Sequence, residues 1–426
     1  MQKIMNKLQT LVFQLEKHHK RKIDLSLDRT FSLLKKLGNP QNKLKNVVSV
    51  VGTNAKASMA YSLKSILNEG GYKCNLYTSP HLQSFTERFI FNDDEIKEEI
   101  LIELLKDIQA VLGDDNASLF EILTCAFLKY AENFRDNVNI IEAGLFFQFD
   151  STNVFKNNLM SLIGVIHTDH LQWLNNKTIE GIIHEKTSKL LNSNIFINRQ
   201  LNDEIKVKIE KALVNNSSNK YFFGKEFNIT IQENGFILYQ DDIGEIILPE
   251  PNLLGDHQLY NISTSIAASR KMFNIKDENI KKGITKIELK GRLQELHSGK
   301  LKDILSKNRL IIDGGHNESS SISISNWIKQ QQQDVHLICG MMKDKEHYEF
   351  MKHFKDVVKS ITLIDIPNQE GSISKEKFKD KLNALKMEIN LSPSIQDAVK
   401  LNAKHQNTIC LFVGSLYMVG EVLNLN

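Results

Sequence analysis

The sequence contains no apolar run long enough to cross a membrane. No window approaches the roughly 20 apolar residues that a membrane-spanning helix requires. The N-terminal stretch MQKIMNKLQTLVFQLEKHHKRK lacks the uninterrupted apolar segment of a signal peptide and instead predicts an amphipathic helix that ends in a basic cluster. We therefore expect a soluble, cytoplasmic protein with no membrane partner.

Cysteine is scarce as well. Cys74, Cys125, Cys339 and Cys410 lie far apart and form no CxxC pair. This spacing argues against a disulfide framework or a zinc site and favours reduced, buried thiols in a cytosolic protein.

The chain also lacks a strong charge of either sign. Its formal net charge is only +3, and the lysines are scattered among glutamates and aspartates, so no nucleic-acid partner is implied. Hydrophobic residues at 41% and charged residues at 25% are typical of a globular protein. The 426 residues exceed what one hydrophobic core usually serves, which predicts two domains.

From residue 46 onward, short β-branched runs alternate with helical patterns. This alternation is typical of βαβ units on a parallel sheet, so the predicted fold class is α/β. We expect a first series with strands at 46–51, 74–77, 138–143, 161–166 and 194–198, and helices at 59–71, 96–112, 118–134 and 178–192.

Two later regions complete the predicted organisation. Residues 225–248 alternate apolar and polar positions, which predicts a β-rich annex of two or three antiparallel strands. A second series has strands at 309–313, 334–340, 359–365 and 408–414. We place the boundary near 288–300 and divide the chain into domains 1–288 and 289–426.

The turn GTNAKAS (52–58) follows a buried strand and opens a helix, as a phosphate-binding loop does. Backbone N–H groups at a helix N-terminus bind phosphate oxygens, Lys56 would neutralise phosphate charge, and the Ser58 hydroxyl could reach Mg²⁺. The regular signature has glycine before the lysine, where φ can be positive, but here the residue is Ala55. An ordinary helix cap explains the turn equally well on these residues alone.

Several polar residues are expected at the same sheet edge. The segment YTSPHLQSFTERF (77–89) follows the second strand, Glu142 closes a later strand, and His170 follows the strand SLIGVI. Ligands bind at the carboxyl edge of open α/β sheets, and a carboxylate, an imidazole and a hydroxyl would suit Mg²⁺ shared with ATP phosphates. Each residue taken alone is more often a solvated surface group.

Ordered blocks along nearly the whole chain resemble the dihydrofolate synthase/folylpolyglutamate synthase family of the Mur ligase superfamily. The matching blocks are LGNPQ (37–41), GTNAKAS (52–58), LYTSPHL (76–82), FEILTCAFL (120–128), DSTN (150–153), DHLQWL (169–174), HEKTSKL (184–190), GDHQLYN (255–261), GRLQEL (291–296), IDGGHN (312–317), MMKDK (341–345) and GSLYMVGE (414–421). The resemblance implies an ATPase domain followed by a smaller Rossmann-like domain, with ATP and the substrates bound between them.

The resemblance also implies a reaction and its cofactors. ATP converts a substrate carboxylate into an acyl phosphate, and the amine of L-glutamate attacks it to give an amide, ADP and phosphate. Mg²⁺ is required, K⁺ is an activator, and the lysine matching Lys186 is carried as a carbamate. A carbamate would form on the neutral amine, which a desolvated site near other cations favours; without the resemblance, Lys186 would be an unmodified helix lysine.

The resemblance assigns roles to particular residues. The catalytic set is Lys56, Lys186, His170 and His316. The nucleotide contacts are Asn54, Ala55, Lys56, Ala57, Ser58, Asn261, Arg292 and Asp313. The Mg²⁺ ligands are Ser79, Glu142 and His170. The dihydropteroate contacts are Asp24, Leu25, Ser26, Thr78, Phe120 and Asp150, and the residues facing glutamate are His316 and Ser415.

Three departures from the family pattern bear on activity. Ala55 and Ala57 replace two glycines of the phosphate loop, which is expected to weaken ATP binding. Phe146–Phe147–Gln148 replaces a Gly-Gly-Arg sequence, so a flexible basic turn becomes bulky and uncharged. Asp256 occupies a position that is often basic in the family.

Three functions follow in order of preference. The first is a monomeric dihydrofolate synthase that also adds glutamate to reduced folates. The alternatives are a nucleotide-binding homologue without ligase activity, which the substituted loops favour, and a monofunctional folylpolyglutamate synthase. A peptidoglycan Mur ligase fits less well, because LYTSPHL and GSLYMVGE belong to the folate branch.

Overall fold

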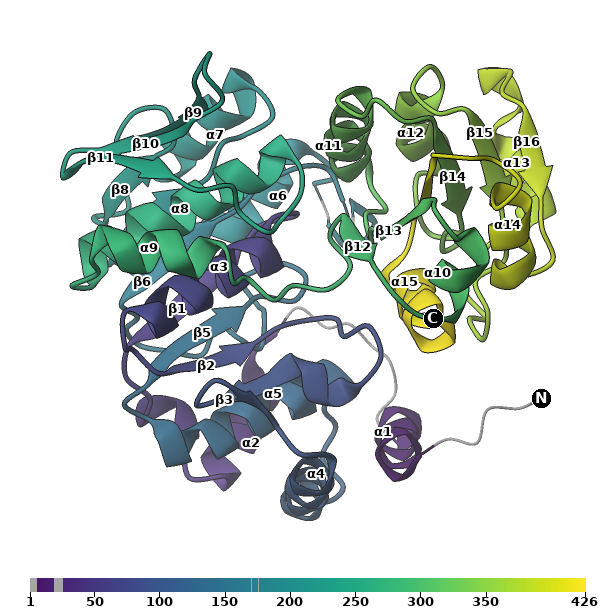
Figure 1. Ribbon diagram of the computed structural model, residues 1–426. Coiled ribbons are helices and arrows are strands. Elements are labelled where there is room, and N and C mark those ends of the chain that lie inside the picture. Colours follow the sequence, from purple (N-terminus) through teal and green to yellow (C-terminus); the bar gives the residue numbers. More distant parts are fainter. Residues whose placement is uncertain (1–5, 19–25, 170, 175) are drawn as a thin grey trace. The chain divides into compact units, whose positions relative to one another are not determined.

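The computed structural model describes residues 6–18, 26–169, 171–174 and 176–426 (Figure 1). The chain forms two compact units. The first comprises Met1–Pro251 and Tyr260–Ile287, and the second comprises Asn252–Leu259 and Glu288–Asn426. The division into an ATPase domain and a ligase domain stays a prediction about what these units do.

The first unit is built on an eight-stranded sheet with the order β4-β3-β2-β5-β1-β6-β7-β8. Strands β2, β5, β1, β6, β7 and β8 are parallel neighbours, and β3 and β4 extend the sheet in antiparallel fashion. The strands are β1 Val47–Val51, β2 Cys74–Tyr77, β3 Phe89–Phe91, β4 Asp94–Glu95, β5 Val138–Glu142, β6 Met160–Ile163, β7 Asn194–Ile197 and β8 Asn219–Phe222. The predicted α/β fold class is confirmed.

The central strands are apolar because both faces of the sheet are covered. Every residue of β1 and β5 is buried, as expected for parallel strands between helices. Their register pairs Val50 with Glu142, and Val51 of β1 pairs with Ile163 of β6. The carboxyl ends of these three strands therefore lie level with one another.

Nine helices of the described residues belong wholly or mainly to this unit. They are α1 Lys7–His18, α2 Asp28–Lys36, α3 Lys56–Glu69, α4 Glu98–Leu112, α5 Leu119–Ala131, α6 Ile179–Thr187, α7 Asp203–Ala212, α8 Asp256–Met272 and α9 Asp277–Ile284. Short 3-10 helices are η1 Pro40–Asn42, η2 Phe85–Arg88, η3 Glu132–Phe134 and η4 Leu171–Trp173. Helix α3 packs on β1, β2, β5 and α9, while α1, α2, α4 and α5 pack together around one apolar core.

The annex predicted at 225–248 is a three-stranded antiparallel sheet with the order β11-β10-β9. Its strands are β9 Phe227–Ile231, β10 Ile237–Asp241 and β11 Gly244–Leu248. Alternate residues such as Ile229, Tyr239 and Ile246 are buried, which is the period-2 burial of a sheet covered on one face. The prediction of the annex is confirmed.

The second unit contains a six-stranded sheet with the order β12-β13-β17-β14-β15-β16, in which only β12 is antiparallel to its neighbour. Its strands are β12 Gln294–Leu296, β13 Arg309–Ile312, β14 Val335–Cys339, β15 Ser360–Leu363, β16 Ile389–Leu391 and β17 Ile409–Val413. Its helices are α10 Lys300–Leu305, α11 Glu318–Lys329, α12 His347–Met351, α13 Lys375–Lys381, α14 Ile395–Asn402 and α15 Leu416–Leu425, with 3-10 turns η5 Lys352–Phe354 and η6 Asn383–Leu385.

Two expectations from composition can be compared with this structure. All four cysteines are free and buried, as predicted. Among the described residues, no helix is both long enough and apolar enough to cross a bilayer.

Candidate active site

The predicted phosphate loop connects β1 to α3. The N–H groups of Thr53 and Asn54 donate to the carbonyl of Val165, at 2.8 and 3.1 Å, which fixes the loop beside β6. Helix α3 begins at Lys56 after Ala55, and no side chain caps it. The first N–H groups of α3 therefore suit a phosphate group, and the choice between a phosphate loop and an ordinary helix start stays a prediction.

Ala55 has the left-handed backbone conformation, with φ of 73° and ψ of −12°. Glycine adopts this conformation without penalty, whereas a residue with a Cβ atom is strained in it. The expectation that this position requires positive φ is confirmed. Ala57, by contrast, lies within the right-handed first turn of α3.

Lys56 and Glu142 meet at the carboxyl edge of the sheet. The Lys56 ammonium donates to the carbonyls of Gly52 and Thr53, at 3.2 and 3.3 Å. It lies 3.9 Å from the carboxylate of Glu142, whose side chain is only 4% exposed at the end of β5. The other oxygen of Glu142 accepts from the N–H of Ser79 at 3.3 Å. Three predicted site residues are thus brought together, and Ser58 is buried nearby on α3.

These residues offer oxygen atoms that a hard cation could use. Among the described residues, no group of three or more histidine, cysteine, aspartate or glutamate side chains is placed to hold a metal ion. The predicted Mg²⁺ set has a different composition, because it combines Glu142 with the Ser79 hydroxyl and His170, and His170 lies outside the described residues. A carboxylate and a hydroxyl beside the start of α3 fit a Mg²⁺ ion, because this cation prefers oxygen ligands.

Lys186 projects from α6 into a buried position beside the predicted phosphate loop. Its ammonium donates to the carbonyls of Gly52 and Leu145, both at 3.0 Å, and lies 5.6 Å from the ring centre of Phe146. Burial, together with the nearby charge of Lys56, lowers the pKa of Lys186 to about 7. A substantial fraction of neutral amine therefore exists at neutral pH, as carbamate formation would require.

The turn that departs from the family pattern contributes to the core. Phe146 and Phe147 are buried in the same apolar cluster as Ile163 and Ile182. Gln148 binds α6, because its N–H donates to Glu185 O at 2.9 Å and its side-chain oxygen accepts from the Ser188 hydroxyl at 3.0 Å. The bulky replacement thus ties this turn to the helix that carries Lys186.

Asp150 organises the same turn from its other end. One carboxylate oxygen accepts from the N–H groups of Gly144 and Leu145, at 3.0 and 3.1 Å. The other accepts from the N–H and hydroxyl of Thr152, at 3.0 and 2.6 Å. Burial raises the pKa of Asp150, and these hydrogen bonds oppose that shift.

The predicted dihydropteroate contacts of the first unit fall into one connected region. Phe120 stacks on Tyr77 with ring centres 6.0 Å apart, and Thr78 follows Tyr77 at the end of β2. A Cβ atom at Gly144 would meet the Phe120 ring at 2.6 Å and the Asp150 carboxylate at 3.2 Å, so Phe120 and Asp150 flank the same glycine. Of the three contacts predicted near the N-terminus, Ser26 is described, while Asp24 and Leu25 lie outside the described residues.

The remaining predicted nucleotide contact of this unit, Asn261, is buried on α8. Its side-chain oxygen accepts from the Asn198 side chain at 2.7 Å, beyond the end of β7. Sequence reasoning missed Asn198 as the partner of Asn261. This pairing is visible only once β7 is placed beside β6 in the sheet.

In the second unit, Asp313, Arg292 and His316 gather at the carboxyl end of β13. The buried Asp313 carboxylate accepts from the N–H groups of Leu293 and Gly315, at 2.8 and 2.6 Å. Burial raises the pKa of Asp313, and the charge of Arg292 opposes the shift. His316 donates from Nδ1 to the Gly314 carbonyl at 2.9 Å.

Ser415 lies on the adjacent strand end of the second unit. It follows β17, the parallel neighbour of β13, and the N–H of Gly414 donates to the Gly315 carbonyl at 2.9 Å. The Ser415 hydroxyl caps α15 by accepting from the N–H of Tyr417 at 3.1 Å. The four residues predicted in this unit therefore share one sheet edge.

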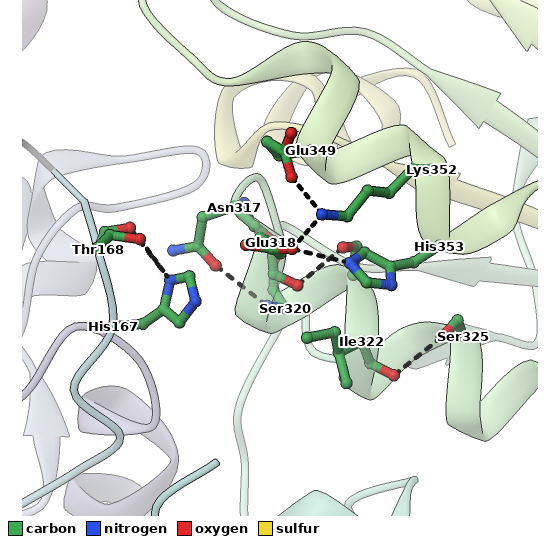
Figure 2. Close-up of polar contacts among 11 residues, drawn as sticks. His167, Thr168, Asn317, Glu318, Ser320, Ile322, Ser325, Glu349, Lys352 and His353 are labelled. Carbon is green, nitrogen blue, oxygen red and sulfur yellow. Dashed lines mark hydrogen bonds and ion pairs between the residues drawn. The ribbon is translucent and has the colours of Figure 1, made fainter. Parts of the chain in front are cut away.

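Figure 2 shows a polar network at the start of α11 that sequence reasoning missed. Asn317 caps the helix, and Glu318 pairs with Lys352 at 2.6 Å and with His353 Nε2 at 3.2 Å. Lys352 also pairs with Glu349. His353 lies 35 residues after Glu318, so no local sequence pattern predicts this network.

Known proteins resemble this chain over different lengths. The family model of the Mur ligase, glutamate ligase domain, matches residues 292–416. The chain is 27% identical to a dihydrofolate synthase/folylpolyglutamate synthase of Bacillus subtilis (strain 168), over 93% of this chain and 94% of that protein. It is 24% identical to a dihydrofolate synthetase of Saccharomyces cerevisiae, over 95% and 98% respectively.

Solved structures share the fold along the whole length. E. coli FolC in complex with DHPP and ADP superposes with a TM-score of 0.85 at 24% identity, covering 100% of this chain and 98% of that one. The bifunctional folylpolyglutamate synthase/dihydrofolate synthase of Yersinia pestis, complexed with AMPPNP and a Mn ion, gives a TM-score of 0.86 at 23% identity, covering 100% and 99%.

Proposed function

We propose that this chain, a member of the dihydrofolate synthase/folylpolyglutamate synthase family of Mur ligases, joins L-glutamate to dihydropteroate and also to reduced folates at the expense of ATP. The observation that carries the proposal is the convergence of Lys56, Glu142 and Lys186 on the loop that starts α3. A charge-neutralising lysine, a carboxylate and a second, buried amine around uncapped helix N–H groups form a site for phosphoryl transfer.

The proposed chemistry has two steps. A carboxylate oxygen of the folate substrate attacks the γ-phosphorus of ATP, the bond from phosphorus to the β,γ-bridging oxygen breaks, and ADP leaves. The glutamate amine then attacks the carbonyl carbon of the acyl phosphate and loses a proton. Phosphate departs with the former carboxylate oxygen, which leaves an amide.

The residues of this chain contribute mainly by position and charge. The first N–H groups of α3 and the Lys56 ammonium bind the transferring phosphate, and their charge stabilises the transition state. Glu142 and Ser79, with His170, would hold Mg²⁺, which neutralises phosphate charge when bound. In the second unit, we assign Arg292 and Asp313 to the nucleotide and His316 and Ser415 to glutamate.

Lys186 is proposed to act as a carbamate. The neutral amine attacks the carbon of CO₂ and loses a proton, so that an anion replaces a cation behind the phosphate loop. The support is its burial, its two carbonyl partners and a pKa of about 7. The further proposals of a cytoplasmic monomer and of K⁺ as an activator rest on the family resemblance.

One observation favours a second candidate function. Ala55 retains a left-handed conformation in which it is strained, at the point where the loop approaches phosphate. A nucleotide-binding homologue that has lost ligase activity would tolerate such a residue.

The experiment that separates the candidates measures products by mass. Purified protein is incubated with ATP, Mg²⁺ and L-glutamate, and with either dihydropteroate or a reduced folate. We expect a glutamate adduct in both reactions. An adduct with the reduced folate alone would indicate a monofunctional folylpolyglutamate synthase, whereas ATP binding without any adduct would indicate the inactive homologue.

A further inference from the structure

An ion pair between a half-buried arginine and a buried glutamate joins the starts of α2 and α5, and the Arg29 side chain is 26% exposed. The Glu121 side chain is 7% exposed, and its two oxygens lie 3.2 and 3.3 Å from Nε of Arg29. The Thr30 hydroxyl donates to the same carboxylate at 3.4 Å, and the N–H of Ser118 also donates to it. Glu121 thus holds the start of α2 while completing the capping box of its own helix.

The location of this pair connects it with the proposed substrate contacts. Phe120 directly precedes Glu121 on α5, and Ser26 lies three positions before Arg29. The Ser26 hydroxyl donates to Asp28 at 2.8 Å and accepts from the N–H of Asp28 at 3.1 Å, which attaches Ser26 to the first residue of α2. A shift of α2 relative to α5 would therefore change the spacing between Ser26 and Phe120.

Packing alone does not explain why a charged pair occupies this position. Burying the Glu121 carboxylate costs solvation energy that an apolar side chain of similar size would not, so this ion pair is weak evidence for stability. What the pair supplies is directional contact, because the planar guanidinium fixes the position of its carboxylate partner. Helices α2 and α5 already pack through the apolar core that they share.

We propose that Arg29 and Glu121 are positioning residues for the pterin side of the substrate. The ion pair fixes the position of Ser26 at the start of α2 relative to the Phe120 ring, and in this way sets the affinity for dihydropteroate. This inference rests on the proposed function. It predicts that loss of the ion pair weakens the binding of dihydropteroate but not the binding of ATP or glutamate.

The test compares Michaelis constants of the Glu121→Gln variant with those of the unaltered protein. Glutamine keeps an acceptor for the Ser118 N–H, as the capping box requires, but removes the charge that holds Arg29. We expect KM for dihydropteroate to rise on the order of tenfold, which corresponds to about 1.4 kcal/mol. KM for ATP and KM for glutamate should stay within about twofold of the values for the unaltered protein.

A second variant and a matched control keep the result interpretable. Arg29→Lys leaves the buried carboxylate paired but loses the fork geometry, so a smaller rise in the same constant is expected even if Glu121→Gln folds poorly. Glu295→Gln is the control, because Glu295 pairs with Arg309 at 2.8 Å in the second unit, where the two side chains are 21% and 29% exposed. It should leave KM for dihydropteroate unchanged.

Two outcomes would overturn the inference, and they differ from failure of the proposed function. If KM for dihydropteroate does not change in either variant, the pair has no positioning role. If all three Michaelis constants rise together, the pair has no role specific to dihydropteroate. If the unaltered protein forms no adduct with dihydropteroate, the proposed function fails first, and the inference fails with it.

Discussion

At the residue scale, the two alanines of the predicted phosphate loop have different conformations. The sequence presents both as glycine replacements that add a methyl group near phosphate. Only Ala55 is left-handed, with φ of 73°, whereas Ala57 is an ordinary helical residue. Replacement of alanine by glycine should therefore relieve strain at position 55 but weaken helix α3 at position 57.

We predict that Ala55→Gly lowers KM for ATP. Removing the Cβ atom relieves a left-handed conformation that costs roughly 1–2 kcal/mol and lets the backbone adjust to the phosphate. Steady-state kinetics with varied ATP measure the effect, and Ala57→Gly is the matched control, since glycine within α3 only weakens the helix. Equal behaviour of the two variants would show that the loop has adapted around alanine.

Lys186 shows a conflict between stability and function at a single residue. Its folded-state pKa is lowered from 10.5 to about 7 by burial, because the charged form is poorly solvated there. The Lys186 amine therefore binds its proton at a higher pH in the unfolded chain than in the folded chain. Lys186 therefore costs stability progressively as the pH falls from 10.5 to about 7, and the cost is constant at lower pH.

We predict that Lys186→Met abolishes ligase activity while raising the free energy of unfolding at neutral pH. The gain should grow as the pH falls from 10 to 7 and then level off. Denaturant titrations of both proteins in CO₂-depleted buffer measure this difference. A gain that shrinks as the pH falls would mean that Lys186 is charged and well paired in the folded state.

At the element scale, a nearly buried ion pair joins the annex sheet to α8. Arg270 of α8 and Asp241 of β10 are 5% and 2% exposed and lie 3.0 Å apart. The Tyr239 hydroxyl donates to the same carboxylate at 3.0 Å. Asp241 therefore depends on Arg270 for charge compensation.

We predict that Arg270→Ala lowers the free energy of unfolding by about 3–5 kcal/mol, because it leaves a buried carboxylate without its counter-ion. Denaturant titration measures the loss. The control is Asp136→Ala, which removes a surface ion pair with Lys45. The side chains of Asp136 and Lys45 are 68% and 66% exposed, so this substitution should have no measurable effect on the free energy of unfolding. Similar small losses in both variants would contradict the role assigned to Arg270.

The sequence predicted long elements better than short ones. The parallel strands were recognisable because burial on both faces makes them continuously apolar, as in VVSVV of β1. The helix predicted at 178–192 ends at Thr187, since the chain turns there and Leu190 enters the core instead. Strands β3 and β4 have three and two residues, too few for a periodic pattern to show.

At the scale of the whole molecule, the predicted site follows from sheet topology. Lys56 and Glu142 could be placed together from sequence because the carboxyl ends of parallel strands share an edge. The partners of Lys186 could not, because they are the backbone carbonyls of Gly52 and Leu145, which carry no sequence signal. The pairing of Arg29 with Glu121 joins residues 92 positions apart and was missed for a similar reason.

The central claim is that this molecule activates a carboxylate by phosphoryl transfer, and an isotope measurement tests it most directly. Dihydropteroate labelled with oxygen-18 in its carboxylate is converted in the presence of ATP, Mg²⁺ and L-glutamate, and the released phosphate is analysed by mass. The account predicts that each phosphate formed with an amide carries one labelled oxygen, and that Lys56→Ala forms neither product. Amide formation accompanied by unlabelled phosphate would contradict it.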